Sequence, residues 1–135
     1  MTELDDFRNQ FLPRLIEAER ELHKGDIKPR LELWTRKDPV TLFGAIGMVN
    51  SGWDEVGETF GWLASTFSNF QSYDMEIIAA DVSGDLAYTV AIERHVTSIN
   101  DGPVEPHALR VTQIYRREDG EWKVVHRHGD ALAER

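Results

Sequence analysis

Two pairs of ionisable side chains stand two residues apart in the chain and could do chemistry together. His126 and His128 form one pair, and Glu93 and His95 form the other. Residues two apart on a strand project from the same face of a sheet. Two imidazoles and a carboxylate can hold a divalent cation if they converge, and a carboxylate or imidazole in a dry pocket can move a proton. The spacing therefore allows a metal site or acid–base catalysis.

A structural role is the alternative for each pair. We expect the imidazoles of His126 and His128 to bond to neighbouring backbone or threonine groups, and this is our default for them. Glu93 could instead form a structural ion pair. Its candidate partners are Arg94, Arg110 and Arg127. For Glu93 and His95 the sequence leaves the catalytic and the structural roles open.

Other catalytic and cofactor-binding motifs are missing from the sequence. The chain has no cysteine, which excludes a disulfide, a thiolate nucleophile and a thiolate metal site. It has no Gly-x-Ser-x-Gly elbow, no phosphate-binding loop and no dinucleotide fingerprint. We therefore expect no cofactor. We also expect no bound metal, because the spacing of the histidines and the carboxylate is permissive and does not show that they converge.

Composition and charge restrict the class of partner. The 135 residues carry 24 carboxylates against 15 lysines and arginines, for a net charge of -9, and this balance repels a phosphate backbone. The start of the chain lacks the basic and apolar regions of a secretory signal, and the longest nearly apolar stretch, residues 41–49, is too short to cross a bilayer. We expect a cytoplasmic protein that binds neither nucleic acid nor membrane and whose partner is a small molecule or a second copy.

The apolar pattern of the first half of the chain indicates helices, because it repeats at steps of three and four. One helix follows residues 4–22. Pro13 lies inside this pattern and lacks a backbone N–H, so residues 1–14 are expected to be a helical extension or the kinked start of that helix. A second, short helix follows at about residues 26–34, and the apolar stripe of a third ends at Phe67. Between these two, residues 40–48 indicate one short strand.

From Phe70 onward the period changes to two, which indicates strands. Four long strands are expected as consecutive antiparallel hairpins over residues 70–82, 86–98, 107–117 and 122–128. Helices followed by a run of strands are typical of an α+β domain. We expect one domain over residues 1–135, in which three N-terminal helices cover a strongly curved, cone-shaped antiparallel sheet. Its open end would be a small-molecule pocket and its outer face a dimer surface.

The turn between the last two expected strands decides which face each residue occupies. A two-residue turn places Gln113 opposite His126. A three-residue loop with a bulge instead places Thr112 opposite His126 and Arg110 opposite His128. A shift of one residue in the register moves every side chain of the strand to the opposite face of the sheet. The residues alone do not decide between the two alternatives.

The last hairpin resembles a known family. Residues 110–128 contain an Arg-x-Thr strand, an Asp-Gly turn, a tryptophan, two apolar positions and a His-x-His ending. This segment resembles the terminal hairpin of SnoaL-like proteins, and the chain from about Leu15 to Asp130 is similar to the nuclear transport factor two-like superfamily, which includes ketosteroid-isomerase-like members. The hairpin is also similar, without gaps, to the end of the association domain of calcium/calmodulin-dependent kinase two. The resemblance implies a cystatin-like α+β roll.

The resemblance to the kinase association domain implies a face for the last hairpin. That domain directs arginines into its pocket at positions matching Glu93, Gln113 and Gly129. Positions 113 and 129 share a face only in the second register. The resulting pocket wall contains Val111, Gln113, Tyr115, Val125 and Arg127. A second polar cluster of Arg110, Thr112, His126 and His128 then occupies the other side. Because this chain has Glu, Gln and Gly at these three positions in place of arginine, we do not expect the pocket to bind an anionic ligand.

The resemblance also implies which residues touch a ligand. Trp53 and Phe60 lie on the apolar stripe of the third helix, so core packing competes with ligand contact as their role. The residues expected to line the pocket are Trp34, Trp53, Phe60, Gln113, Tyr115 and Arg127. Trp62 lies off that stripe, and an exposed tryptophan there would indicate a partner surface.

A SnoaL-like fold does not select one reaction. It implies an internal pocket that binds a small, mostly apolar organic molecule. Our first hypothesis is a cofactor-independent isomerase, cyclase or hydrolase-like catalyst with Glu93 or His95 as the base, and with Gln113 and Tyr115 donating hydrogen bonds to a substrate oxygen. The alternative is a non-catalytic oligomerisation or ligand-sensing module. A homodimer through the sheet face is expected, and a cone filled by side chains would favour the alternative.

Overall fold

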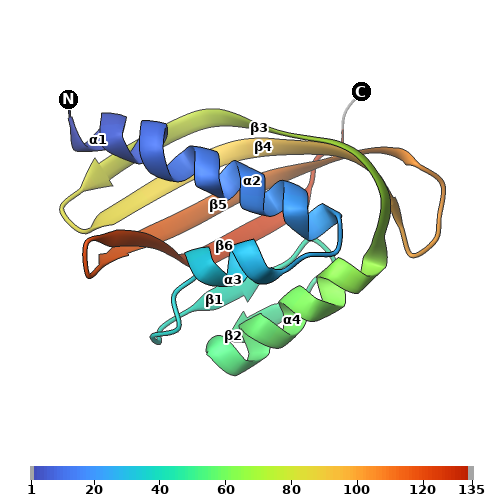
Figure 1. The fold of residues 1–135 in the computed structure, drawn as a ribbon, viewed down its shortest axis with the longest axis horizontal. Helices are drawn as coiled ribbons and strands as arrows, with labels where there is room; N and C mark the ends of the chain where they lie inside the picture. The colour runs from blue at the N-terminus through green and yellow to red at the C-terminus, as the bar shows by residue number, and fades with distance from the viewer. Residues whose placement is uncertain (1, 134–135) are drawn as a thin grey trace.

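Helices and strands divide the chain into an N-terminal helical part and a C-terminal sheet, as Figure 1 shows for the computed structural model. The structure describes residues 2–133. The helical segments are α1 (Glu3–Asp6), the π-helical turn η1 (Phe7–Phe11), α2 (Leu12–His23), α3 (Lys28–Leu33) and α4 (Trp53–Thr66). The strands are β1 (Thr41–Phe43), β2 (Val49–Ser51), β3 (Phe67–Ser83), β4 (Leu86–Ile99), β5 (Glu105–Glu118) and β6 (Glu121–Ala131).

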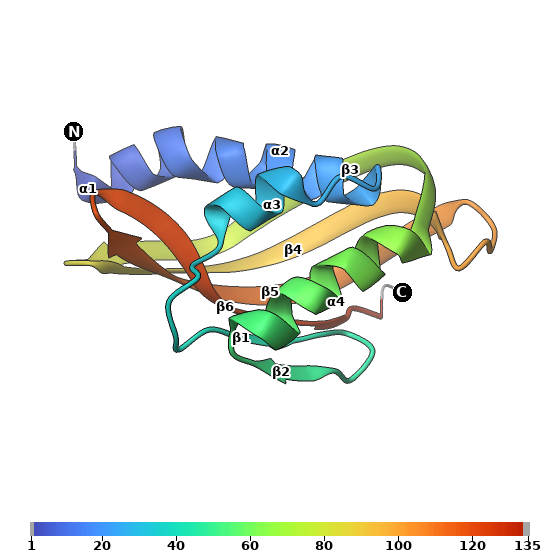
Figure 2. The same ribbon diagram turned by 60° about the horizontal axis from the view of Figure 1, so that its bottom comes forward.

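The strands form one curled, mostly antiparallel sheet in the order β2-β1-β6-β5-β4-β3. Only the β1–β6 pair is parallel among the described strands. In Figure 2, α1, α2 and α3 lie over one face of the long strands, and α4 lies next to β1 and β2. The expected α+β arrangement is confirmed. The core fills the space between these helices and the inner face of the sheet.

The long N-terminal helix begins at Glu3 and contains an irregular turn directly before Pro13. Thr2 and Asp5 form a capping box at its start. In η1 the N–H of Leu12 bonds to the carbonyl of Phe7, five residues earlier. Proline has no N–H with which to continue an α-helical ladder, so a wider turn accommodates the break. The helix therefore runs on through the proline site, with Phe7 and Phe11 buried.

Two boundaries differ from those expected. Residues 40–48 do not form one strand, because a turn at Gly44–Gly47 separates β1 from β2 and the two strands pair with each other. Gly47 adopts a positive φ of 93°, which favours glycine. Phe67 is not the last residue of a helix but the first of β3, where it pairs with Ile99 of β4. Pairing across the sheet outweighs the helical apolar spacing at this position.

The last hairpin combines a two-residue turn with a bulge. Glu118 pairs with Glu121 around the turn, but beyond the bulge Ile114 pairs with His126. Val125 is the extra residue, and neither expected register is correct along the whole hairpin. Gln113 nevertheless pairs with Arg127, so these two residues share the inner face as the second register required. Because Val125 is the bulged residue, Val124 rather than Val125 is buried on the inner wall.

None of the described helices is both long and apolar enough to cross a membrane.

Candidate functional site

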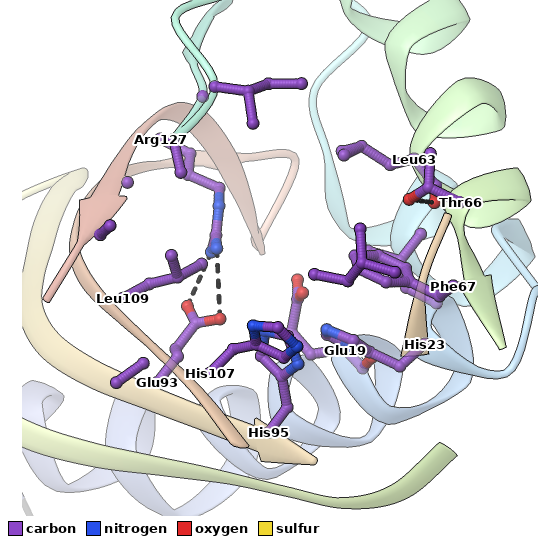
Figure 3. A pocket seen from close by; sticks show the side chains of 18 of the residues that line it. Glu19, His23, Leu63, Thr66, Phe67, Glu93, His95, His107, Leu109 and Arg127 are labelled. Atoms are coloured by element: carbon purple, nitrogen blue, oxygen red, sulfur yellow. Dashed lines mark hydrogen bonds and ion pairs between the residues drawn. The ribbon is translucent and has the colours of Figure 1, made fainter. Parts of the chain in front are cut away.

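A cavity of about 400 Å³ opens at the end of the sheet where β4 ends and β5 begins. This volume lies within the usual range of small-molecule sites. Helices α2 and α4, the turn after β1, and strands β4, β5 and β6 all contribute to its wall (Figure 3). Its charged or imidazole-bearing lining residues among those described are Glu19, His23, Arg30, Glu93, His95, His107 and Arg127. The cone is therefore not filled by side chains.

One side of the cavity carries a buried ion pair between Glu93 of β4 and Arg127 of β6 (Figure 3). Arg127 Nη1 donates to Glu93 Oε2 at 2.7 Å and Nη2 donates to Oε1 at 3.2 Å. Nη1 also donates to Gln113 Oε1 at 3.3 Å. Burial alone would raise the pKa of Glu93, but the charge and hydrogen bonds of Arg127 outweigh it and hold this pKa below its ordinary value. Glu93 is thus an ionised carboxylate with both oxygens engaged.

A second buried ion pair joins Glu19 of α2 to Arg30 of α3 in the cavity wall. Arg30 Nε and Nη2 donate to the two carboxylate oxygens of Glu19 at 3.0 and 2.9 Å. Sequence reasoning missed this pair. The signal was present, because Glu19 is a charged residue next to the apolar stripe that includes Leu15 and Leu22. A carboxylate in that position needs a buried partner.

Three imidazoles form a row along the floor of the cavity (Figure 3). The ring centroids of His23 and His95 are 4.5 Å apart, and those of His95 and His107 are 5.1 Å apart. His23 Nδ1 donates to the carbonyl of Glu19 at 2.6 Å. His95 Nδ1 and His107 Nε2 are buried and have no hydrogen-bond partner among residues 2–133. Two histidines that line the cavity thus each carry a buried ring nitrogen without a partner in the described part of the chain.

Burial keeps two histidines of this row, His23 and His95, from gaining a proton. Burial, together with the nearby imidazoles of His23 and His107, lowers the pKa of His95 to about 3. Burial also lowers the pKa of His23. Both imidazoles are therefore neutral near pH 7. With Glu19 paired to Arg30 and Glu93 to Arg127, the charges of the described lining residues cancel.

Three of the residues expected as catalytic or pocket-lining groups line the cavity, namely Glu93, His95 and Arg127. The first two were expected as catalytic groups, and that role stays a prediction. Arg127 was expected as a lining residue. Glu93 has the structural arginine partner that the alternative required, whereas His95 has none among the described side chains. The two candidate bases therefore differ in their surroundings, because Glu93 is held in an ion pair and His95 Nδ1 has no described partner.

The other five expected lining residues are not among those that form the cavity wall. Trp34 and Phe60 pack against each other in the core, with ring centroids 4.9 Å apart. Tyr115 is fully buried there, and its hydroxyl is hydrogen-bonded to Thr89 at 2.7 Å and to Gln113 at 2.9 Å. The remaining residue, Trp53, packs against the core from the start of α4. Core packing is therefore the role of these aromatic rings, and the expected hydrogen bonds from Gln113 and Tyr115 to a ligand are not supported.

The second polar cluster lies on the opposite, outer face of the sheet. His126 Nδ1 is hydrogen-bonded to Thr41 Oγ1 at 2.7 Å, which agrees with the structural default for this histidine. The ring of Phe43 contacts His126 and His128 edge to face. Arg110, Thr112 and His128 are exposed there, and Arg110 pairs with Asp130. Within residues 2–133, no three histidine, aspartate or glutamate side chains are grouped to hold a metal ion.

Trp62 is half exposed and lines the cavity from α4. It also borders an adjoining open groove between α4 and the β1–β2 turn. Sequence reasoning assigned an exposed Trp62 to a partner surface. Its position at the cavity wall makes it an intrinsic fluorescence reporter of cavity occupancy.

Comparison with protein families finds that residues 9–134 match the model of a SnoaL-like domain. No curated protein matches the chain.

Solved structures show the same fold at low sequence identity. A ketosteroid isomerase-like protein from Erwinia carotovora atroseptica is 20% identical with a TM-score of 0.79, and the alignment covers 98% of each chain. A protein with a cystatin-like fold from Caulobacter vibrioides is 14% identical with a TM-score of 0.71, over 98% of this chain and 92% of that one. A candidate calcium/calmodulin-dependent protein kinase type II association domain from Thiobacillus denitrificans is 19% identical with a TM-score of 0.64, over 96% and 91%.

Proposed function

The chain belongs to the SnoaL-like domain family, and from that premise we propose that its cavity binds a small, mostly apolar organic molecule. The observation behind this proposal is the open cavity of about 400 Å³, whose charged lining residues already neutralise one another. Much of the remaining wall is apolar, with Leu22, Leu42, Leu63, Phe67 and Leu109 among its residues. Such a wall favours an apolar body, and the few polar groups orient it.

Gly129 offers a way to test binding without disturbing the core. It lines the cavity, and a Cβ atom built there would lie 3.7 Å from Val111 and 3.8 Å from Arg127, which is ordinary contact. We expect Gly129→Leu to fill the cavity and abolish binding while the protein stays folded. Native mass spectrometry of wild-type protein from its own cells, followed by identification of the released molecules, supplies the ligand. Trp62 fluorescence then measures its affinity for both proteins.

The matched control is Gly61→Ala on the exposed side of α4, where an added Cβ meets nothing within 4 Å. Helix propensity makes this change stabilising by about 1 kcal/mol and leaves the cavity unchanged. Ligand affinity equal in the wild type and in folded Gly129→Leu protein would show that the molecule binds elsewhere and would overturn the proposal.

A second candidate function is proton transfer on the bound molecule, favoured by the unpartnered Nδ1 of His95 in the cavity wall. Glu93 is the weaker candidate base, because both of its oxygens accept hydrogen bonds from Arg127. The neutral imidazole of His95 has a lone pair that can accept a proton from a ligand, although its lowered pKa makes it a weak base near neutral pH. Substitution His95→Gln is expected to abolish turnover of the identified ligand while retaining its binding. Unchanged turnover in this variant would eliminate the catalytic hypothesis and leave the binding function.

We also propose that the outer face of the sheet pairs two copies of the chain. Tyr88 of β4 and Ile114 of β5 lie opposite each other on this face and are 43% and 39% exposed. Val90 and Phe43 extend the same apolar surface toward its two sides. Contiguous exposed apolar residues of this kind mark interaction surfaces, and a two-fold pair would bury them against themselves.

A further inference from the structure

Arg30 lines the cavity with a guanidinium group that the protein satisfies only in part. Its Nε and Nη2 atoms bond to Glu19, whereas Nη1 is buried and has no hydrogen-bond partner among the described residues. The side chain is 2% exposed, and its Cζ lies 4.8 Å from the ring centroid of Phe60. A buried donor on a charged group is costly when it lacks an acceptor. The N–H groups of Nη1 therefore lack an acceptor in the described part of the chain, and Arg30 borders a cavity whose occupant could supply one.

The other polar groups of the wall do not supply that acceptor. The Glu93 carboxylate is taken up by Arg127, and the Glu19 carboxylate is already bonded through both oxygens to the other nitrogens of Arg30. His95 Nδ1 and His107 Nε2 are themselves without partners within residues 2–133. An occupant with an acceptor oxygen would satisfy Nη1, and its polar group could also meet these ring nitrogens.

The charge balance of the wall selects an uncharged occupant. Glu19 and Arg30 cancel, Glu93 and Arg127 cancel, and the imidazole of His95 stays neutral. A carboxylate ligand would add a third negative charge to a buried site with two positive ones. Removing that unmatched charge from water carries a large penalty. The oxygen of an uncharged group, such as an amide, an ester or a ketone, accepts the same hydrogen bond without this desolvation penalty.

We infer that Arg30 is the polar anchor of the ligand site, and that the ligand is an uncharged molecule whose acceptor oxygen bonds to Arg30 Nη1. The inference rests on the proposed binding function and narrows it to one class of ligand. It also adds a binding residue at a position that the family resemblance did not indicate.

Three probes of nearly equal shape test the inference, namely 2-naphthamide, 2-naphthoate and 2-isopropylnaphthalene. Their affinities are measured near neutral pH through Trp62 fluorescence or calorimetry. A hydrogen bond to a charged donor strengthens binding by roughly tenfold or more, so the amide is expected to bind that much more tightly than the hydrocarbon. It is also expected to bind more tightly than the carboxylate, which would bring an unmatched charge into the buried site. An infrared or carbon-13 shift of the labelled amide carbonyl on binding would report the hydrogen bond directly in the wild type.

The variant Glu19→Leu/Arg30→Met removes the anchor together with its buried partner, so that no lone charge is left in the core. We expect it to weaken amide binding by roughly tenfold or more and to change the affinity for the hydrocarbon by less than about twofold. The matched control is Glu17→Leu/Arg20→Met, an exposed ion pair on the same helix. This control should leave all three affinities unchanged.

Each outcome decides a different point. Binding of the naphthoate as tight as that of the amide overturns the uncharged class, while the cavity remains a ligand site. An amide affinity and carbonyl shift that survive the double substitution overturn Arg30 as the anchor and leave a bound water as its partner. If none of the three probes binds wild-type protein, the proposed function fails along with the inference.

Discussion

Arg127 of β6 reaches over the whole width of β5 to pair with Glu93 of β4. Its two Nη atoms donate to the two carboxylate oxygens at 2.7 and 3.2 Å, and Gln113 of the intervening strand accepts a further hydrogen bond from Nη1. The interaction thus joins three neighbouring strands on their inner face. It also holds a charged, polar wall at one side of an otherwise largely apolar cavity.

Removing one member of this pair should destabilise the fold strongly. In Glu93→Gln the buried Arg127 guanidinium loses its counter-charge, and loss of one partner of a buried pair typically costs about 3 to 5 kcal/mol. Chemical denaturation should show a reduction of that size in the free energy of unfolding. The double variant Glu93→Leu/Arg127→Met should recover most of it, because no unpaired charge remains.

Asp130→Asn is the control for this comparison. It breaks the exposed pair of Asp130 with Arg110 on the outer face, where water screens the charges and the stability should hardly change. If Glu93→Gln and Asp130→Asn lowered the free energy of unfolding equally, the buried pair would contribute no more to stability than the exposed one.

The neutral imidazoles of His23 and His95 predict that the protein loses stability in mild acid. Burial lowers the pKa of His23 and of His95, the latter to about 3 from an unfolded value of 6.5. Below pH 6.5 the unfolded chain therefore binds more protons than the folded protein does. The free energy of unfolding, which is largest above pH 6.5, decreases as the pH falls below that value. The decrease from His95 continues until the pH approaches about 3.

His95→Gln should flatten this dependence by up to about 1 kcal/mol per pH unit. The window between pH 6.5 and about 5 isolates the effect, because the stabilisation from Glu93, whose folded pKa is lowered, is lost only below the ordinary glutamate value of 4.5. Denaturant unfolding at a series of pH values measures the slope. Thr112→Gln, at an exposed residue of the opposite face, introduces the same side chain away from the cavity, leaves every histidine in place and should keep the wild-type slope.

Deleting Val125 should leave the faces of the last strand unchanged. Val124 pairs with Tyr115 and His126 pairs with Ile114, so removal of the residue between them closes the bulge and keeps these pairs in register. We expect Arg127 to stay on the inner face with its Glu93 pair, and backbone hydrogen exchange in β5 and β6 to stay close to that of the wild type. Deletion of Val111, which is paired on both sides, shifts β5 against its neighbours and should accelerate this exchange. The prediction fails if both deletions behave alike.

Ile114→Glu should convert the proposed homodimer into monomers. The substitution places a charge in the centre of the outer apolar surface, opposite Tyr88, where burial against a second copy would be unfavourable. Size-exclusion chromatography with light scattering measures the mass. Val104→Glu, at a residue of similar exposure in the β4–β5 loop, should leave the dimer intact. A wild-type monomer at high protein concentration would rule the interface out.

Local pattern was sufficient to predict most of the secondary structure and one local feature of the site. The steps of three and four predicted the helices, and the change to a period of two predicted the long strands, because burial of one face imposes these periods directly on the sequence. The same reasoning placed Glu93 and His95 on one face of a strand, and both do line the cavity.

Other features depended on contacts between distant parts of the chain. The Glu19–Arg30 pair joins two helices, the imidazole row combines α2, β4 and β5, and the bulge at Val125 sets the position of Arg127. Pattern could not separate Tyr115 in the core from Arg127 in the cavity wall, since both lie on the inner face. Which inner residues border open space is decided by how helices pack over a curved sheet, and no local period of the sequence records that packing.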